Sequence, residues 1–394
     1  MAGLTYQKDK PRGYGINLVD SFQRIYITQY GAVLQIEKTL PWKLRFIGAA
    51  RFDNHSNFGN FLSPKIGLVK AVGTGNVRVT WGRAYSMPSI LYQYARTGGF
   101  FFGNGEGITY IPNGANVNDE TSYRTTTALL PEKVSTWEVG YKGSFFNKLN
   151  VDVSYYNGVS DNFFTPSIQV DGRALFVGKH KVTPAFPGEI DSNGILSGAR
   201  FSTIFNFGEV KVFGLDAGVN YQFNNNVNFA IKYSRLGSDI SDGPIENDAN
   251  GDGWVTEDEK SLNSPRNSLV ASLNFDNLVK QKVFINISAR YVEEYDFYSG
   301  FQMSTKAGEG KWGVIETPDG RRYPKNFDWG PLGGTTIDIR AGYRLNDMVS
   351  FTFGVTNLLD AEVRQFAGSS YIHRLYQAEV KIHVPNKNKQ TLNP

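Results

Sequence analysis

The chain reads GLDAGVNYQF from residue 214 to residue 223, and every second residue of this stretch is apolar. The apolar set is Leu215, Ala217, Val219, Tyr221 and Phe223, and the residues between them are glycine or polar. A turn of three asparagines follows at 224–226, after which the alternation resumes at Val227. Because side chains of a strand point alternately to opposite faces, this pattern predicts a hairpin with one apolar face and one polar face.

The same period of two recurs along the chain and predicts thirteen strands. They lie at 27–38, 43–54, 62–72, 77–85, 133–144, 149–158, 208–223, 227–236, 266–276, 283–294, 335–345, 349–357 and 373–384, and the first 26 residues have room for part of another. Short turns alternate with long connections at 86–132, 159–207, 237–265, 295–334 and 358–372. This arrangement is typical of an all-β transmembrane antiparallel barrel with long extracellular loops and short periplasmic turns.

Charged residues recur on the polar faces of these strands. A soluble sandwich or propeller is the alternative fold, but the charges disfavour it and no propeller-like repeat of about 40–50 residues is present. In a wide barrel the polar face lines a wet lumen, whereas an Arg or Lys on the lipid face costs about 2–4 kcal/mol at mid-depth. The charged residues expected to face the lumen are Arg45, Arg51, Glu138, Lys142, Asp216, Lys232, Arg290, Asp338 and Arg340.

Composition excludes several other classes of protein. The 394 residues carry a net charge of +4 without a basic block, so nucleic acid is not an expected partner. The absence of cysteine excludes disulfides and thiolate metal sites. No apolar run reaches the ~18 residues of a transmembrane helix. Met1 does not lead into a signal peptide, so either a signal peptide has been removed or the chain begins partway through a longer one, and we expect the second.

Four segments carry motifs of a known family. They read LSPKIGLV at 62–69, VTWGRAYSMPS at 79–89, LPEKVSTWEVGYKG at 130–143 and GVTNLLD at 354–360. In this order they resemble the barrel of TonB-dependent outer-membrane receptors, in the form common in the Bacteroidetes lineage. The resemblance implies that residues 1–384 are the C-terminal portion of a 22-stranded barrel and that 385–394 are a polar tail. It also implies that the plug domain is absent from this chain and that further strands complete the wall.

The resemblance implies active uptake across the outer membrane of a Gram-negative bacterium, with no enzymatic activity. The substrate, of siderophore, cobalamin, glycan or peptide type, would bind at the extracellular loops and move inward when TonB pulls on the plug. The implied partners are outer-membrane lipid, the N-terminal barrel and plug portion of the same receptor, TonB through the plug, and, as an open question, a substrate-binding lipoprotein lid. Four lumen residues would contact the plug, namely Arg45, Arg51, Glu138 and Arg340. A non-energised porin, or a structural barrel that docks other outer-membrane proteins, is the alternative.

The segment 248–259 has the spacing of a twelve-residue calcium loop. Such a loop needs oxygen ligands at positions 1, 3, 5, 7, 9 and 12 and a glycine at position 6, where the chain turns sharply. The ligands would be Asp248, Asn250, Asp252, the backbone carbonyl of Trp254, Thr256 and Glu259. No helical pattern surrounds the segment, so we predict a structural Ca²⁺ that pins the loop and no organic cofactor. A turn that binds nothing is the alternative.

Aromatic residues gather in two of the long connections. They are Tyr92, Tyr94, Phe100, Phe101, Phe102 and Tyr110 in the first, and Trp312, Tyr323, Phe327 and Trp329 in the second. They would line an extracellular substrate vestibule by stacking on a ligand, or they would pack loop against loop. The four histidines lack metal-ligand spacing and no nucleophile motif is present, so no catalytic residue is expected. The stretch 103–107, which reads GNGEG, is interpreted as a flexible loop.

Overall fold

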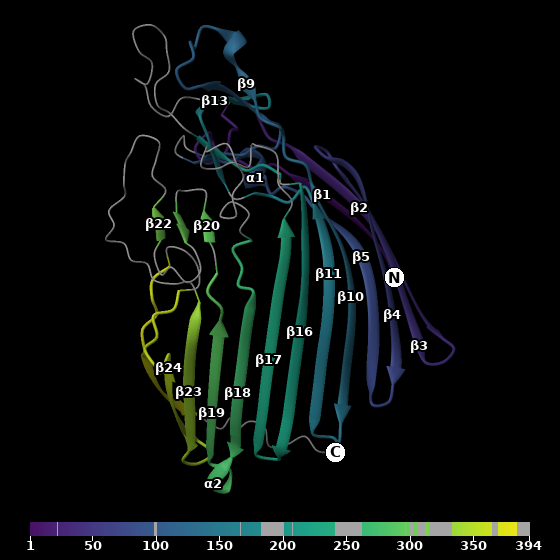
Figure 1. Cartoon of the computed structure of the whole chain (residues 1–394), viewed down its shortest axis with the longest axis vertical. Helices are drawn as coiled ribbons and strands as arrows, with labels where there is room; N and C mark the ends of the chain where they lie inside the picture. Colours follow the sequence, from purple (N-terminus) through teal and green to yellow (C-terminus); the bar gives the residue numbers. More distant parts are fainter. Residues whose placement is uncertain are drawn as a thin grey trace, which may run out of the picture.

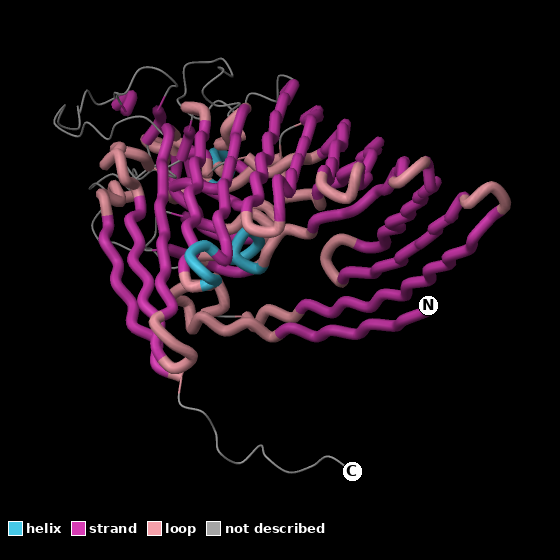
Figure 2. Tube along the Cα trace, turned by 90° about the horizontal axis from the view of Figure 1, so that it is seen from below, coloured by secondary structure: helices cyan, strands magenta, loops and turns pink. Residues whose placement is uncertain are grey.

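One large antiparallel sheet dominates the computed structural model, which describes residues 1–21, 23–97, 101–165, 167–182, 201–206, 208–240, 262–295, 297–299, 303–305, 312–314, 333–364 and 369–383. The sheet has 14 strands. Across the sheet they are β1 (Ala2–Asp9), β2 (Ile27–Leu40), β3 (Leu44–His55), β4 (Gly59–Val72), β5 (Gly75–Ser86), β10 (Glu132–Phe145), β11 (Leu149–Asp161), β16 (Glu209–Asn224), β17 (Val227–Ile240), β18 (Asn267–Asn277), β19 (Val283–Val292), β23 (Gly334–Arg344), β24 (Val349–Thr356) and β25 (Leu375–Ile382). Figures 1 and 2 show that the sheet curves into a trough.

The predicted all-β antiparallel fold is confirmed. Each of the thirteen predicted ranges overlaps one long strand, and β1 is the additional strand within the first 26 residues. Only the ends differ. For example, β17 continues to Ile240 because Val210 of β16 pairs with it there. In the part of the chain that the structure describes, β1 and β25 each pair on one side only. Closure into a barrel of 22 strands stays a prediction.

The strand register separates an apolar face from a polar face. Ile231 pairs with Val219 on one side and with Ala271 on the other, and Ala271 pairs with Ala289. One position along, the row on the opposite face contains Asn220, Ser272 and Ser288, with the small Ala230 between Asn220 and Ser272. The apolar face is widely exposed in the isolated chain, as Val380 (59%) and Phe353 (52%) illustrate. Exposed apolar surface on this scale is expected of a wall that meets lipid.

The short and long connections lie at opposite rims of the sheet, as the alternating connection lengths predicted. The short turns lie at one rim, together with the single-turn α2 (Leu278–Gln281), and the long connections lie at the other (Figure 1). Two of the tight hairpin turns have positive φ at both central residues, namely Trp42 and Lys43 (59° and 57°) and Phe146 and Asn147 (52° and 54°), and residues 279–281 of the longer α2 turn also have positive φ. Two positive φ values in succession are the geometry of a type I′ hairpin, whose twist matches that of the flanking strands.

Three long connections fold together at the long-loop rim. We call the described residues of 10–26, 87–131 and 162–208 the loop layer. It contains two four-stranded sheets, α1 (Ile90–Tyr94) and the 3₁₀ turn η1 (Glu120–Ser122). The strands are β6 (Arg96–Thr97), β7 (Phe101–Phe102), β12 (Ile168–Val170) and β15 (Phe201–Thr203) in one sheet, and β8 (Ile108–Pro112), β9 (Arg124–Thr125), β13 (Gly172–Val177) and β14 (His180–Lys181) in the other. A third small sheet joins β20 (Phe297–Ser299), β21 (Met303–Thr305) and β22 (Trp312–Val314).

Among the described residues, the main hydrophobic core lies in the loop layer and not against a face of the large sheet. Its fully buried members include Val19, Ile108 and Val177, each at most 2% exposed. Ile27, at the first position of β2, joins the same cluster and so ties the loop layer to the wall. In the described ranges, no helix is long and apolar enough to cross a membrane.

Candidate functional site

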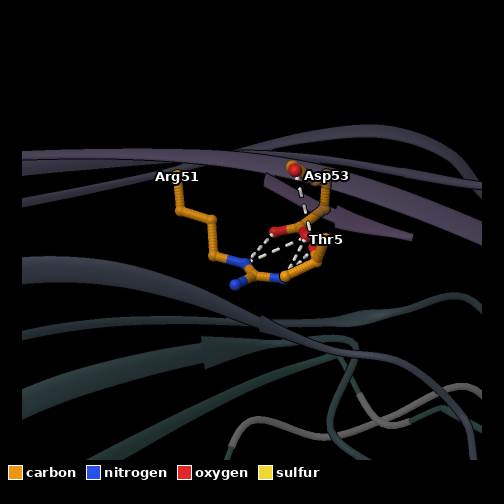
Figure 3. Close-up of polar contacts among 4 residues, drawn as sticks. Thr5, Arg51 and Asp53 are labelled. Atoms are coloured by element: carbon orange, nitrogen blue, oxygen red, sulfur yellow. Dashed lines mark hydrogen bonds and ion pairs between the residues drawn. The ribbon is translucent and has the colours of Figure 1, made fainter. Parts of the chain in front are cut away.

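The polar face of the sheet carries a first ion pair near its N-terminal edge. The guanidinium of Arg51 donates to both carboxylate oxygens of Asp53 at 2.6–2.9 Å and approaches the hydroxyl of Thr5 at 3.5 Å. Figure 3 shows these side chains on the side of β1 and β3 that faces the strands across the trough. Gly31 makes room for them, because a Cβ there would lie 2.4 Å from an Asp53 oxygen. The polar face is therefore the concave one.

A larger charge network spans β5, β10 and β11 on the same face. Arg78 donates to Glu138 at 2.8 Å and to Asp152 at 3.2 Å, and Lys142 contacts the other oxygen of Asp152 at 3.2 Å. The Arg78 guanidinium lies over Gly140, where a Cβ would come within 2.6 Å of its Cζ. These side chains keep 29–72% of their surface exposed, so the network offers hydrogen-bonding groups to whatever occupies the trough.

The predicted lumen residues lie on this polar face. Arg45 contacts Glu37 at 3.3 Å, and Arg340 contacts Glu379 at 3.8 Å. Sequence reasoning missed Arg78, Asp152 and Glu37, although their positions in the alternation place them on the same face. Whether Arg45, Arg51, Glu138 and Arg340 contact a plug stays a prediction.

Amide side chains form a second polar feature toward the short-turn rim. Asn220 and Asn228 exchange hydrogen bonds at 2.9 and 3.3 Å, and Asn228 also donates to Gln222 at 3.2 Å. On the next two strands, Asn286 donates to Asn274. Because each amide carries a donor and an acceptor, the row satisfies itself without any net charge.

The stretch 103–107 is a packed junction in which every residue except Glu106 is buried, and its interpretation as a flexible loop is wrong. Asn104 has no exposed surface, and its amide donates to the carbonyl oxygens of Thr127 (2.8 Å) and Ile204 (3.1 Å). Its side-chain oxygen accepts from the Thr126 hydroxyl at 2.7 Å. A Cβ on Gly103 would lie 2.4 Å from the Tyr94 amide nitrogen. The glycines permit this close packing, and glycine composition alone does not distinguish it from flexibility.

The aromatic residues of the first long connection divide into buried and accessible ones. Tyr94 (2% exposed) and Phe102 (3%) belong to the core of the loop layer, and Tyr110 packs against it. Packing of loop against loop, the alternative to a vestibule, accounts for these three side chains. Tyr92 is 37% exposed and meets Phe164 edge-on at 5.6 Å. Phe101 is half-buried in β7. Among the predicted vestibule residues whose side chains the structure describes, Tyr92 is the most exposed.

A polar cluster borders this core, with Tyr94 and His180 buried and Asn57 and Glu106 exposed. The Tyr94 hydroxyl donates to Glu106 at 2.5 Å and accepts from Asn57 at 2.8 Å, and burial raises the pKa of Tyr94. The His180 ring meets the Tyr94 ring edge-on at 5.5 Å and is 2% exposed. Burial lowers the pKa of His180, with Glu106 and Asp20 acting in the opposite direction and Lys179 in the same one. His180 is therefore neutral in the folded loop layer at neutral pH.

This burial predicts that acid loosens the loop layer. A histidine in the unfolded chain binds a proton below about pH 6.5, whereas folded His180, with its lowered pKa, binds a proton only at lower pH. The contribution of neutral His180 to the stability of the loop layer is therefore fully present above about pH 6.5 and is lost as the pH falls below it. Limited proteolysis of the 87–131 and 162–208 connections should accelerate between about pH 7.5 and about pH 5. The change should shrink in His180→Gln, because only the contribution of His55, whose pKa burial also lowers, then remains, and it should persist in full in His373→Gln, whose ring is exposed. An identical pH profile for parent and His180→Gln would contradict the assignment.

Several predicted residues fall outside the described residues. They are the whole calcium loop, with Asp248, Asn250, Asp252, Trp254, Thr256 and Glu259, and the aromatics Phe100, Tyr323, Phe327 and Trp329. Trp312 begins β22, of which only the backbone is described. Across the residues that are described, no three His, Asp or Glu side chains gather as a metal site.

A pocket near the long-loop rim was not predicted from the sequence. Its volume is about 250 Å³. It lies on the polar face, between the long-loop ends of β18, β19 and β23 and the connection that follows β24. Its lining includes Arg290, Thr336, Val363 and Arg364. Arg290 was expected on the polar face, but its neighbour Arg364 comes from a loop that periodicity cannot place.

Comparison with known proteins identifies the fold. Residues 1–358 match the family model "TonB dependent receptor-like, beta-barrel". No curated protein matches. Among solved structures, the chain is similar to the siderophore receptor PirA from Acinetobacter baumannii (15% identity, TM-score 0.61, covering 97% of this chain and 51% of that one). It is also similar to the FrpB iron transporter from Neisseria meningitidis (11% identity, TM-score 0.58, covering 97% and 52%). The chain thus spans about half the length of these structures.

Proposed function

Because the chain belongs to the family of TonB-dependent receptor β-barrels, which are outer-membrane transporters and not enzymes, we propose that it forms the wall and substrate-facing loops of an active importer. The chain is accordingly an outer-membrane protein. The observation that carries the proposal is the register of the large sheet, which presents a mainly apolar face on one side and charge networks on the other. That arrangement suits a wall between lipid and a hydrated interior.

The substrate class of this importer is a metal chelate of siderophore type. The solved structures that resemble the chain include siderophore receptors, iron transporters and a copper transporter. Cobalamin, glycans and peptides are the other candidate substrates. The family implies a plug within the barrel and an interaction with TonB. The charge network at Arg78, Glu138 and Asp152 is suited to hold such a plug, because its exposed donors and acceptors face the trough.

Uptake in cells tests both the activity and its energy source. Cells that lack the complete gene should lose uptake of one labelled member of a panel of ferric siderophores, cobalamin, oligosaccharides and peptides. Reintroducing the gene should restore that uptake. Removing TonB from the restored cells should reduce uptake to the level of cells without the gene. Uptake that continues without TonB would instead support a non-energised porin, and no uptake of any probe would support a structural barrel.

Calcium at 248–259 is a separate part of the proposal and rests on the ligand spacing alone. Asp248 and Glu259 are the first and last ligands of the loop. In the parent protein, calcium should slow proteolysis within 237–265, and removing it with a chelator should restore cleavage. Replacing both residues with alanine should abolish this protection without changing cleavage elsewhere. Cleavage of the parent that is indifferent to calcium would contradict the site. Extracellular calcium modules typically bind at about 10⁻⁴–10⁻³ M, so the titration should reach millimolar calcium.

A further inference from the structure

The pocket beside Arg290 is built from cationic and hydroxyl side chains. Its lining comprises Pro265, Ser268, Arg290, Val292, Tyr295, Gly333, Gly334, Thr336, Val363 and Arg364, and no carboxylate is among them. Ser268, Arg290 and Thr336 come from neighbouring strands, with Arg290 directly opposite Thr336. A hydrated anion entering this pocket would therefore meet two guanidinium groups and the hydroxyls of Ser268 and Thr336, with the Tyr295 side chain also in the lining.

Arg290 differs from most other arginines of the polar face because no carboxylate neutralises it within the described residues. Arg45, Arg51, Arg78 and Arg340 each have an acidic partner. The cross-strand neighbours of Arg290 are Val270 and Thr336. Two acidic residues close to Arg290 in the strands accept hydrogen bonds from other groups. Asp338 accepts a hydrogen bond from the Asn357 amide at 2.8 Å, and Glu293 accepts one from Asn267. The charge of Arg290 is thus available to a ligand.

Arg364 and two glycines fix the other wall of the pocket. Arg364 is 7% exposed, donates to the Ser369 carbonyl oxygen and lies 3.8 Å from the centre of the Tyr371 ring. The amide of Gly333 donates to the Arg364 carbonyl oxygen at 3.2 Å. Gly333 and Gly334 have φ values of 101° and 127°, and a Cβ on Gly333 would lie 2.7 Å from the Val292 carbonyl oxygen. Only glycine permits this close approach, which brings the loop against the strand ends.

We infer that this pocket binds an oxyanion group, a carboxylate or a phosphate, through Arg290 and Arg364. Guanidinium groups present paired donors that match both kinds of anion. About 250 Å³ accommodates one small anionic group and not an entire drug-sized ligand. If that group belongs to the imported substrate, the substrate is anionic. This step rests on the proposed function. The binding of the anion itself does not depend on transport.

Binding to the purified full-length protein in detergent at low ionic strength tests the inference. The probes are succinate and inorganic phosphate, with succinamide as the uncharged counterpart of succinate. At least one anion should bind saturably and succinamide should not. Arg290→Gln should weaken that binding about 10- to 100-fold, as expected for loss of a charge-assisted hydrogen bond, and Arg290→Lys should weaken it less. Lys232→Gln is the matched control, because Lys232 is an exposed cation on the same face outside the pocket.

Each outcome has a defined meaning. Saturation by succinate alone identifies a carboxylate site, saturation by phosphate alone identifies a phosphate site, and saturation by both identifies a general oxyanion site. Absence of saturable binding by either anion overturns the inference, as does an equal loss in Arg290→Gln and Lys232→Gln. Uptake measured with and without TonB is independent of this assay. A pocket that binds anions in a protein that imports nothing would refute the proposed function and leave the site intact.

Discussion

Replacing Ala271 with arginine is expected to lower the free energy of unfolding by about 2–4 kcal/mol. Ala271 lies near the middle of β18, on the apolar face, between Ile231 and Ala289 of the neighbouring strands. A guanidinium placed there at mid-depth loses its hydration and has no acidic partner. Urea unfolding of the protein inserted in lipid vesicles measures the change, with the fraction that migrates as the compact, unheated form on a gel as a second readout.

The adjacent substitution Ser272→Arg provides the control. Ser272 is also a small, partly buried residue of β18, but its side chain lies on the polar face between Ala230 and Ser288. A charge there enters a hydrated space, so the free energy of unfolding should change by about 0.5 kcal/mol or less. Equal destabilisation by the two substitutions would mean that both faces are dry, and the membrane-wall interpretation would then be wrong.

Asn104→Ala is expected to open the loop layer at a local cost of about 2–4 kcal/mol. The substitution removes three side-chain hydrogen bonds and leaves the Thr127 and Ile204 carbonyl oxygens and the Thr126 hydroxyl without this partner. Each unsatisfied buried group costs about 1–3 kcal/mol, and relaxation or entering water recovers part of the sum. Hydrogen exchange of the 87–131 and 162–208 connections measures the opening, and the strands of the large sheet should exchange as in the parent protein.

Asn118→Ala is the matched control in the same connection, because Asn118 is exposed and lies outside the packed junction. It should leave exchange of the loop layer unchanged. If Asn104→Ala also left exchange unchanged, the stretch 103–107 would be a flexible loop after all, as its composition first indicated. If instead the large sheet lost protection, the loop layer and the wall would form one cooperative unit, contrary to the local effect expected here.

The wall of the protein was predictable from the sequence because its strands obey a local rule. Leu215, Ala217 and Val219 alternate with polar residues, and the two phases on either side of a membrane wall require that alternation. The same alternation places Arg45 and Arg340 on the polar face. Strand ends were less accurate, since the extent of β17 depends on its neighbour β16.

The sequence by itself determined the fold class, the order of the strands and the face on which each strand residue lies, because each of these follows from the spacing of neighbouring residues. Only the tertiary structure decided that Asn104 joins two connections, that Tyr94 and Phe102 are buried, and that Arg364 lies beside Arg290. These contacts join residues as far as 100 positions apart in the sequence, within loops that have no regular alternation of apolar and polar residues. Close packing and hydrogen-bond geometry select such contacts, and neither leaves a regular pattern in the sequence.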